Sequence, residues 1–542
     1  MVNQIINKLK FFLKKDTFII KTLSFSYLLF IIFNRIRLGS DQLVQLGSAV
    51  NFLNGGEFTL SIFDGEEVFL STVDDWPLFY RVFSIPFLML FKDLEFIYLS
   101  ILVSSYILLL LSINEIINRV FLNKNNKTAA LNLIFISTAF CLSPFRFGSE
   151  IDVFSMSFIF FLLVKVYDYF NEGNKAIDLL MIFFFFFLLV NSRYAYILFI
   201  LLFLAFLLIL DLIQKSFIKN LILKTSGVFL IILNIFYLTQ THYFQKTSSM
   251  ISEASNVGKT AWSYFYSFGF NSLFPDYILL NFAVKVLNFN LSSNYLLFAM
   301  PVFFISIALL VLLLNTTLKR LKQNITSKFV TLEVLLLVAG LLNLINLLYI
   351  FGVFTSYKEE QIASISSIVY AGLSVNNRYL ILTFASFFLL IVCYSIFYKK
   401  IYQLLILMSI LVGVSHNFYL GFKYSFSRSK NMNFVNYPIG SYNDCLEINK
   451  IISKENNSLQ NQLFVVCYRN DSANFRQITP RKLVVASGIT ILNNINSVKH
   501  YNFKVKEFEG FEKIYYCDYK KNNNHVFKNK IYEGNIYNLY TN

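Results

Sequence analysis

Residues 182–210, "IFFFFFLLVNSRYAYILFILLFLAFLLIL", decide the structural class of this protein. Two wholly apolar tracts flank the short segment "NSRYAY", and neither tract has a polar face. A helix that is apolar all round is stable only in lipid or inside a bundle. The whole chain shares this character, because 56% of its 542 residues are hydrophobic, 14% are charged, and the mean hydropathy is +0.57. The sequence therefore predicts an all-α polytopic membrane protein and excludes a soluble globule.

Apolar runs that are long enough to cross a bilayer predict about eleven transmembrane helices. They lie near residues 17–34, 96–116, 129–144, 151–168, 177–190, 196–213, 227–240, 295–314, 329–352, 379–397 and 402–420. Lys and Arg cluster at the amino end and in every alternate loop after it. Since basic loops stay in the cytoplasm, we expect a cytoplasmic N-terminus, an extracytoplasmic tail and a multi-pass location in the plasma (inner) membrane. The net charge of +16 follows from this pattern and a basic tail, so no nucleic-acid partner is implied.

The predicted topology places every long segment on the extracytoplasmic side. Residues 1–422 form the predicted membrane domain, whose first outer loop covers residues 35–95, and residues 423–542 form a small α+β tail domain. In the tail we predict short strands at Phe464–Tyr468, Lys482–Ala486, Phe503–Phe508 and Lys513–Tyr519, because Asn, Ser and Gly separate them. The tail also holds Cys445, Cys467 and Cys517, which allow one disulfide and leave one thiol over on this oxidising side.

The sequence carries no motif of the nucleotide-binding or common hydrolase types. It contains no GxxxxGK, no GxGxxG after a strand and no GxSxG, and no Cys or His spacing that is typical of structural zinc. Nucleotide-driven chemistry on this chain is therefore not expected.

Polar side chains gather at the predicted outer ends of several spans. The candidates are Asp41 after the first span; Asp74 and Asp75; Arg146 and Glu150 in "SPFRFGSE"; Arg193 and Tyr194 in "NSRYAY"; and Arg378 and Tyr379 in "NNRYL". Ionisable groups at a membrane are functional candidates by default, because they are expensive to place there. A partly desolvated carboxylate can accept a proton from a hydroxyl or amine, and arginines bind phosphate bidentately. Such a set suits group transfer from a lipid phosphate donor, and a sugar is the group we expect.

The order of these segments resembles the GT-C superfamily of integral membrane glycosyltransferases. The likeness is to the bacterial branch similar to protein O-mannosyltransferases and aminoarabinose transferases. Asp41 is followed by "AVNFLNGGEFTL", "FDGEEV" and "DDWPLFYRVFSIPFLMLF", in the family's order. Glu150 ahead of "IDVFSMSFIFFLLV" resembles its acid-led helix entry, and "SRYAYILFILLFL" and "NNRYLILTFASFFLLI" resemble its two Arg-Tyr helix starts. The likeness runs from about residue 17 to residue 400, and it lies in the ordered series rather than in one motif.

The resemblance implies a polyprenyl-phosphate-linked sugar donor, inverting transfer, and a glycan, lipid or protein of the cell envelope as the acceptor. It makes Asp41 the general base and Arg193 and Arg378 the candidates for the donor phosphate. Gln42 stands where many relatives carry a second acid, and Trp76–Pro77 replaces a double proline. Some relatives bind a divalent metal and others do not, so the metal stays open.

Each candidate also has a purely structural interpretation. Asp41 can cap the helix that starts there, and Asp74 and Asp75 can form a solvated turn before a proline. Arg193 and Arg378 can be anchors that reach the interface from span ends. A transporter or flippase for lipid-linked glycans is the alternative function, and an O-antigen polymerase or ligase is a third. Transporters commonly show internal repeats and Gly- or Pro-broken spans, neither of which is evident here.

Overall fold

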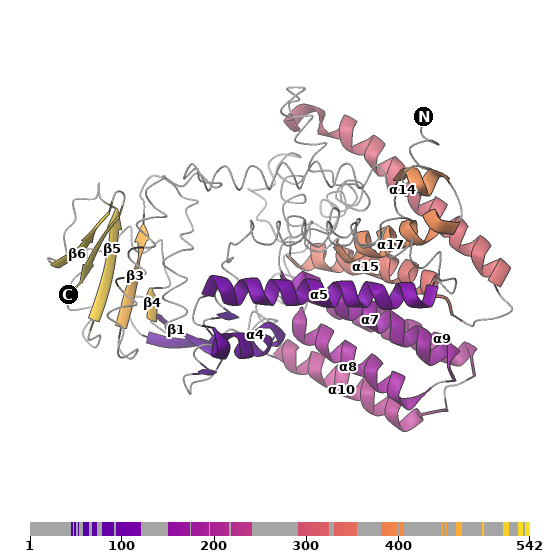
Figure 1. Ribbon diagram of the computed structural model, residues 1–542, viewed down its shortest axis with the longest axis horizontal. Helices are drawn as coiled ribbons and strands as arrows, with labels where there is room; N and C mark the ends of the chain where they lie inside the picture. Colours follow the sequence, from indigo (N-terminus) through magenta and orange to yellow (C-terminus); the bar gives the residue numbers. More distant parts are fainter. Residues whose placement is uncertain are drawn as a thin grey trace, which may run out of the picture. The chain divides into compact units, whose positions relative to one another are not determined.

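The structure is a computed structural model (Figure 1) that divides into two compact units. The helical unit comprises Met1–Phe33 and Leu102–Leu420, and the mixed unit comprises Asn34–Ile101 and Gly421–Asn542. The described residues are 45, 46, 48, 49, 52, 53, 58–63, 68–72, 78–91, 94–120, 150–173, 175–193, 196–215, 218–240, 291–324, 330–354, 381–397, 400–405, 447, 451, 462–468, 490–492, 513–519, 529–534 and 537–541.

Long apolar helices make up the described part of the helical unit. They are most of α5 (Leu94–Val120), then α7 (Glu150–Asn171), α8 (Ala176–Ser192), α9 (Ile197–Ile213), α10 (Leu221–Gln240), α14 (Leu291–Asn324), α15 (Leu332–Phe354) and α17 (Ile381–Phe397). Three segments of the described chain are long and apolar enough to cross a membrane, namely Phe96–Val120, Ile151–Asn171 and Leu221–Leu238. The described residues confirm a mainly helical chain with a small sheet, and the three apolar segments suggest a membrane protein. The number of spans stays a prediction, and the spans expected at 17–34, 129–144 and, beyond residue 405, 402–420 lie outside the described residues.

Helix α7 is the most deeply enclosed of the three candidate spans, because 89% of its apolar window is buried. Its residues pack against α8, α15 and α17, so side chains on every side of the helix meet protein. Phe154 and Phe160 are among the largest fully buried side chains of the described chain. A helix without a lipid-facing side must satisfy each of its polar groups through neighbouring helices.

The carboxyl end of α7 is bonded to the connection between α9 and α10. The last four carbonyls of a helix have no partner within the helix. Gln214 donates from Nε2 to the carbonyl of Phe170 at 2.9 Å, and Lys219 donates from Nζ to the carbonyl of Gly173 at 2.6 Å. The ammonium of Lys219 also complements the negative end of the α7 dipole.

A third connection, between α14 and α15, is bonded to the same end of α7. Asn171 donates from Nδ2 to the carbonyl of Val330 at 2.8 Å, and the Val330 N–H donates to Asn171 Oδ1 at 3.4 Å. Thus the short connections between three pairs of consecutive helices, α7–α8, α9–α10 and α14–α15, are held together around one helix terminus.

An ion pair also joins the two helices of each of these pairs near their short connection. The pairs are Lys165–Asp178 in α7–α8 at 3.0 Å, Lys224–Asp211 in α9–α10, and Arg320–Glu333 in α14–α15 at 2.7 Å. All three carboxylates are buried. The connections concerned are three of the basic loops that the sequence pattern assigns to the cytoplasm.

The mixed unit is built on a seven-stranded sheet with the strand order β2-β1-β4-β3-β5-β7-β6. The strands are β1 (Thr59–Phe63), β2 (Val68–Thr72), β3 (Gln462–Tyr468), β4 (Thr490–Leu492), β5 (Lys513–Tyr519), β6 (Asn529–Glu533) and β7 (Tyr537–Thr541). Strands β1, β4, β3 and β5 are parallel neighbours, while β2, β7 and β6 pair in the antiparallel sense. Figure 1 shows this sheet with β1 next to β4. The hairpin β1–β2 comes from the predicted first outer loop, so strands from both ends of the chain share one sheet.

The strands predicted at Phe464–Tyr468 and Lys513–Tyr519 are confirmed as β3 and β5. Those predicted at Lys482–Ala486 and Phe503–Phe508 lie outside the described residues, as does Cys445. Helix α4 (Phe79–Leu90) also belongs to this unit, and Arg81 at its start donates to the carbonyl of Phe58 at 3.3 Å.

Gly340 allows α15 to lie close to α17, and we expect Gly340→Ala to destabilise the protein. A Cβ at this position would lie 2.4 Å from Cε1 of Phe387, whose ring is fully buried. The overlap should cost about 1–3 kcal/mol, which exceeds the gain of about 1 kcal/mol that Ala brings to a helix. The measurement is the temperature at which the detergent-solubilised protein loses its monodisperse peak on size-exclusion chromatography.

The variant Phe387→Leu supplies the control, because the smaller side chain makes room for the added methyl group. In that background Gly340→Ala should raise the unfolding temperature instead of lowering it. A decrease of equal size in both backgrounds would show that the ring of Phe387 is not what the glycine accommodates.

Candidate functional site

Two of the residues that the sequence singles out as site candidates are described in the structure. Glu150 is the first residue of α7, and Arg193 follows directly on the last residue of α8. The other seven candidates lie outside the described residues: Asp41, Asp74, Asp75, Arg146, Tyr194, Arg378 and Tyr379. The site is therefore built here from the place where α7 begins and α8 ends.

Arg193 ends α8 with extended backbone, at φ −160° and ψ 112°. Its N–H still donates to the carbonyl of Leu189 at 3.1 Å, and its own carbonyl accepts from the N–H of Tyr196 at 3.1 Å. These two bonds lead the chain from α8 into α9 within a few residues. The backbone of Arg193 is fixed on both sides, although its side chain is one of the longest and most flexible types.

The guanidinium of Arg193 forms an ion pair with the carboxylate of Asp152 on α7. Asp152 is fully buried and Arg193 is only 7% exposed, so both charges are removed from water. Burying either charged group alone would cost several kcal/mol. Each of the two is therefore stable in this position only together with its partner. The pair is internally neutral, and Asp152 sets the orientation of the guanidinium.

Serine hydroxyls continue this contact between α7 and α8. The hydroxyls of Ser155 and Ser192 lie 3.0 Å apart, and both serines are buried. Ser155 also bonds the carbonyl of Ile151 at 2.9 Å, and Ser192 bonds that of Leu189 at 3.0 Å. The hydroxyls therefore fix the separation of the two helices at this end.

The polar contacts extend from the start of α9 into α15 and α17. Asn346 of α15 accepts at Oδ1 from the N–H of Phe199 at 3.2 Å, which satisfies one of the first N–H groups of α9. Asn346 also donates to Asn343 at 3.5 Å, and Asn343 donates to the hydroxyl of Thr383 on α17 at 2.9 Å. We call Asp152, Ser155, Ser192, Arg193, Asn343, Asn346 and Thr383 the polar band.

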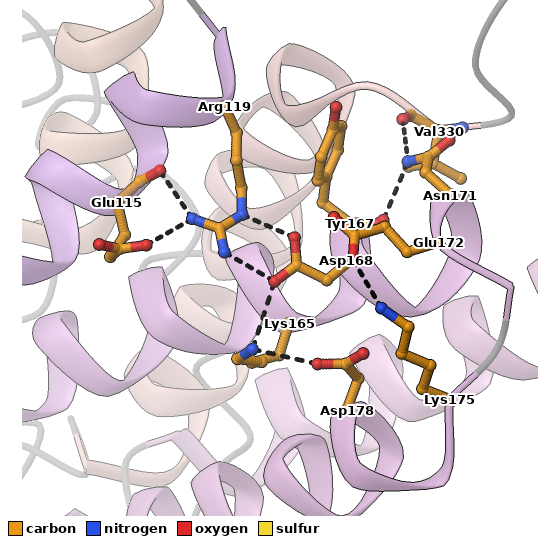
Figure 2. Close-up of polar contacts among 10 residues, drawn as sticks. All are labelled: Glu115, Arg119, Lys165, Tyr167, Asp168, Asn171, Glu172, Lys175, Asp178 and Val330. Carbon is orange, nitrogen blue, oxygen red and sulfur yellow. Dashed lines mark hydrogen bonds and ion pairs between the residues drawn. The ribbon is translucent and has the colours of Figure 1, made fainter.

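A second polar cluster lies at the opposite end of α7 (Figure 2). Arg119 at the end of α5 donates to Asp168 of α7 through Nε at 2.6 Å and through Nη2 at 2.8 Å. A third guanidinium nitrogen contacts Glu115 at 2.5 Å. Lys165 then bridges Asp168, at 3.3 Å, and Asp178 of α8, at 3.0 Å. We call Glu115, Arg119, Lys165, Asp168 and Asp178 the ionic cluster.

The geometry of the ionic cluster is that of a structural clamp. Both aspartates are buried, and each carboxylate is matched by a cation of a neighbouring helix or turn. The bidentate pairing of Arg119 fixes direction as well as distance, so it sets how α5 meets α7. Asp152 and Asp168 are separated by about 24 Å along α7, which is close to the thickness of the apolar core of a bilayer.

Sequence reasoning missed Asp152 and the whole ionic cluster. A usable signal was present, because an acid in "EIDVFSMSF" and a Lys–Asp pair in "LLVKVYDYF" interrupt otherwise apolar helices. The pairing partners, however, lie on other helices, and their identity follows only from the fold. As for a metal, no group of three or more His, Cys, Asp or Glu side chains that could hold one occurs in the described part of the chain.

No protein-family model matches the chain, and no curated protein or solved structure matches it either. The function is therefore inferred from the residues of this chain.

The variant Asp152→Asn should destabilise the protein strongly, because it removes the carboxylate that pairs with the buried guanidinium of Arg193. Breaking one side of a buried ion pair costs about 3–5 kcal/mol. A matched control is Lys175→Gln, which breaks the Lys175–Glu172 pair whose side chains are 56% and 54% exposed and should change stability by less than about 1 kcal/mol. Both are measured as the shift in unfolding temperature of the solubilised protein.

The double variant Asp152→Leu with Arg193→Met tests whether the loss comes from the unpaired charge. It removes both charges and retains similar volume, so it should be more stable than Asp152→Asn alone. If Asp152→Asn proves as mild as Lys175→Gln, the ion pair does not hold α7 to α8.

Proposed function

We propose that this protein is an integral membrane glycosyltransferase that moves a sugar from a polyprenyl-phosphate-linked donor to an acceptor of the cell envelope, on the outer face of the plasma membrane. The observation that carries the proposal is the ordered series of acidic and Arg-Tyr segments in the sequence, in which Arg193 stands at the junction of α8 and α9. A guanidinium with a fixed orientation at a helix end near the membrane surface suits recognition of a lipid phosphate. The ordered resemblance to GT-C enzymes gives the same chemistry from the sequence.

The proposal assigns roles to the residues that the sequence pattern selects. Asp41 acts as the general base that takes the proton from the acceptor. Arg193 and Arg378 bind the donor phosphate and offset the negative charge that builds on it as the sugar leaves. The remaining candidates, Asp74, Asp75, Arg146, Glu150, Tyr194 and Tyr379, line the donor and acceptor sites. A divalent metal is compatible with the scheme and no step depends on it.

The alternative, a transporter or flippase for lipid-linked glycans, needs a bundle that opens at both membrane faces in turn. The structure favours a fixed scaffold at one of these faces. There the connections of three consecutive helix pairs are joined through the terminus of α7, and an ion pair links the two helices of each pair. An enzyme whose substrates both arrive at the other face needs no movement at this one. An O-antigen polymerase or ligase would use the same face and differs in the donor.

The variant Asp41→Asn should abolish sugar transfer while the protein is still made and inserted. An amide cannot accept the proton that the acceptor hydroxyl or amine must lose. The measurement is the mass profile of envelope lipids and glycans extracted from cells with the wild type, with the variant and without the gene. A difference of one sugar between the first profile and the other two identifies donor and acceptor together.

The control is Asp64→Asn, which removes an acid of the same predicted loop without a proposed role and should leave the profile unchanged. Full transfer by Asp41→Asn would remove this residue from the mechanism. A profile that is the same with and without the gene would sink the enzyme proposal and favour the transporter.

The proposed topology is testable with single cysteines in a variant that lacks the five natural ones. Lys530→Cys in the tail should react with a membrane-impermeant maleimide on intact spheroplasts. Lys175→Cys in the α7–α8 connection should react only after the membrane is opened, because that connection belongs to the basic loops. Both lysines are partly exposed, which makes them accessible to the reagent. Labelling of Lys175→Cys on intact spheroplasts would reverse the proposed orientation.

A further inference from the structure

The hairpin β1–β2 needs a further strand to be stable. Its strands have five residues each and are joined by a short connection. An isolated two-stranded hairpin is at best marginally stable in water, and it needs a third strand or a helix to pack on. Here the third strand is β4, with the register Ile62–Ile491 and Phe63–Leu492. More than four hundred residues separate the two partners in the chain.

The composition of the strands supports this long-range pairing. One row of Cα partners runs across five strands, from Phe69 on β2 through Ile62, Ile491 and Phe464 to Tyr515 on β5. Every residue of the row is aliphatic or aromatic, and Tyr515 is fully buried. Cross-strand pairs of these types favour sheet formation. The hairpin thus extends the row of aliphatic and aromatic residues that runs across the C-terminal strands.

Strand β4 depends on the hairpin in return. It has three residues and stands between β1 and β3, parallel to both. Without β1 it would be a very short edge strand with an unpaired row of backbone groups. The sheet of the C-terminal segment is therefore completed by residues of the loop that follows the first predicted span.

We propose that the C-terminal segment is a positioning domain for the first loop: its sheet takes up the β1–β2 hairpin and thereby holds that loop at one face of the membrane. The pairing stands independently of any reaction. Its consequence for catalysis rests on the proposed function, because Asp41 precedes β1 closely in the sequence. The tail then acts on Asp41 through the loop it anchors and does not itself contact the reacting atoms.

Three cysteine pairs, each in a variant without the natural cysteines, test the pairing in native membranes. Ile62→Cys with Ile491→Cys joins direct partners on β1 and β4. Phe69→Cys with Ile491→Cys is the matched control, because Phe69 lies in the same row one strand further away. Neighbouring strands are about 4.8 Å apart, so the control pair is separated by about 10 Å, beyond the reach of about 7 Å that a disulfide allows. Ile62→Cys with Phe69→Cys tests the hairpin itself.

The readout is a covalent link between the two parts of the chain after cleavage at a protease site engineered between them, or, for the hairpin pair, loss of free thiol. Mild oxidation should link Ile62→Cys to Ile491→Cys and close the hairpin pair, while Phe69→Cys with Ile491→Cys gives less than a tenth of that yield. A link for both pairs with Ile491→Cys, or for neither, overturns the proposal, as does an open hairpin pair.

A second readout compares sugar transfer by the Ile62→Cys, Ile491→Cys variant before and after oxidation. A permanent anchor predicts rates that agree within a factor of two, because the bond only fixes a contact that already exists. Loss of transfer on oxidation, restored by a reductant, would contradict the permanent anchor and show that the tail must leave the loop during turnover. Cross-linking without transfer in any variant or in the wild type would leave the pairing intact and refute the proposed function.

Discussion

The structure of the helical unit depends on how helix α7 compensates the charges it carries into a fully enclosed environment. Asp152, Lys165 and Asp168 all lie on this helix, and neither water nor lipid headgroups can serve the two buried aspartates. In such surroundings an unpaired charge costs several kcal/mol, a large part of the roughly 5–15 kcal/mol by which folded proteins are stable. Each of these charged residues therefore needs an oppositely charged side chain from a neighbouring helix within ion-pair distance.

That requirement explains the arrangement of the neighbours. Helix α8 brings Arg193 to one end of α7 and Asp178 toward the other, so the two helices must be antiparallel, and the stretches between their paired residues must be similar in length. Arg119, near the end of α5, pairs with Asp168 and so fixes where this end of α5 meets α7. The apolar middle sections have no preference of this kind, because dispersion and close packing are almost non-directional. Polar groups at the two ends thus set register, while aromatic and aliphatic side chains between them supply contact area.

The sequence was sufficient for several apolar helices and for strands β3 and β5, and insufficient for the partners of these elements. Apolar runs predicted α7, α8 and α9 to within a few residues, because hydrophobicity is a local property of the chain. Strands β3 and β5 followed from local signals in the same way. Strands β1 and β2 were not predicted as strands, since their stability derives from a partner more than four hundred residues away. For the same reason Arg193 was expected at a helix end, but its partner Asp152 was not foreseen.

Two constraints of different physical origin bear on the orientation of the chain in the membrane. The distribution of Lys and Arg predicts that alternate loops lie in the cytoplasm, and this prediction considers the charge of each loop separately. Sheet pairing is stricter: backbone hydrogen bonds between β1 and β4 form only if both strands lie on the same side of the bilayer. An even number of crossings must therefore separate residue 63 from residue 490. The ten predicted spans between the first loop and the tail satisfy this condition, as would any other even number. The pairing of β1 with β4 thus constrains the number of crossings to be even without setting the number itself.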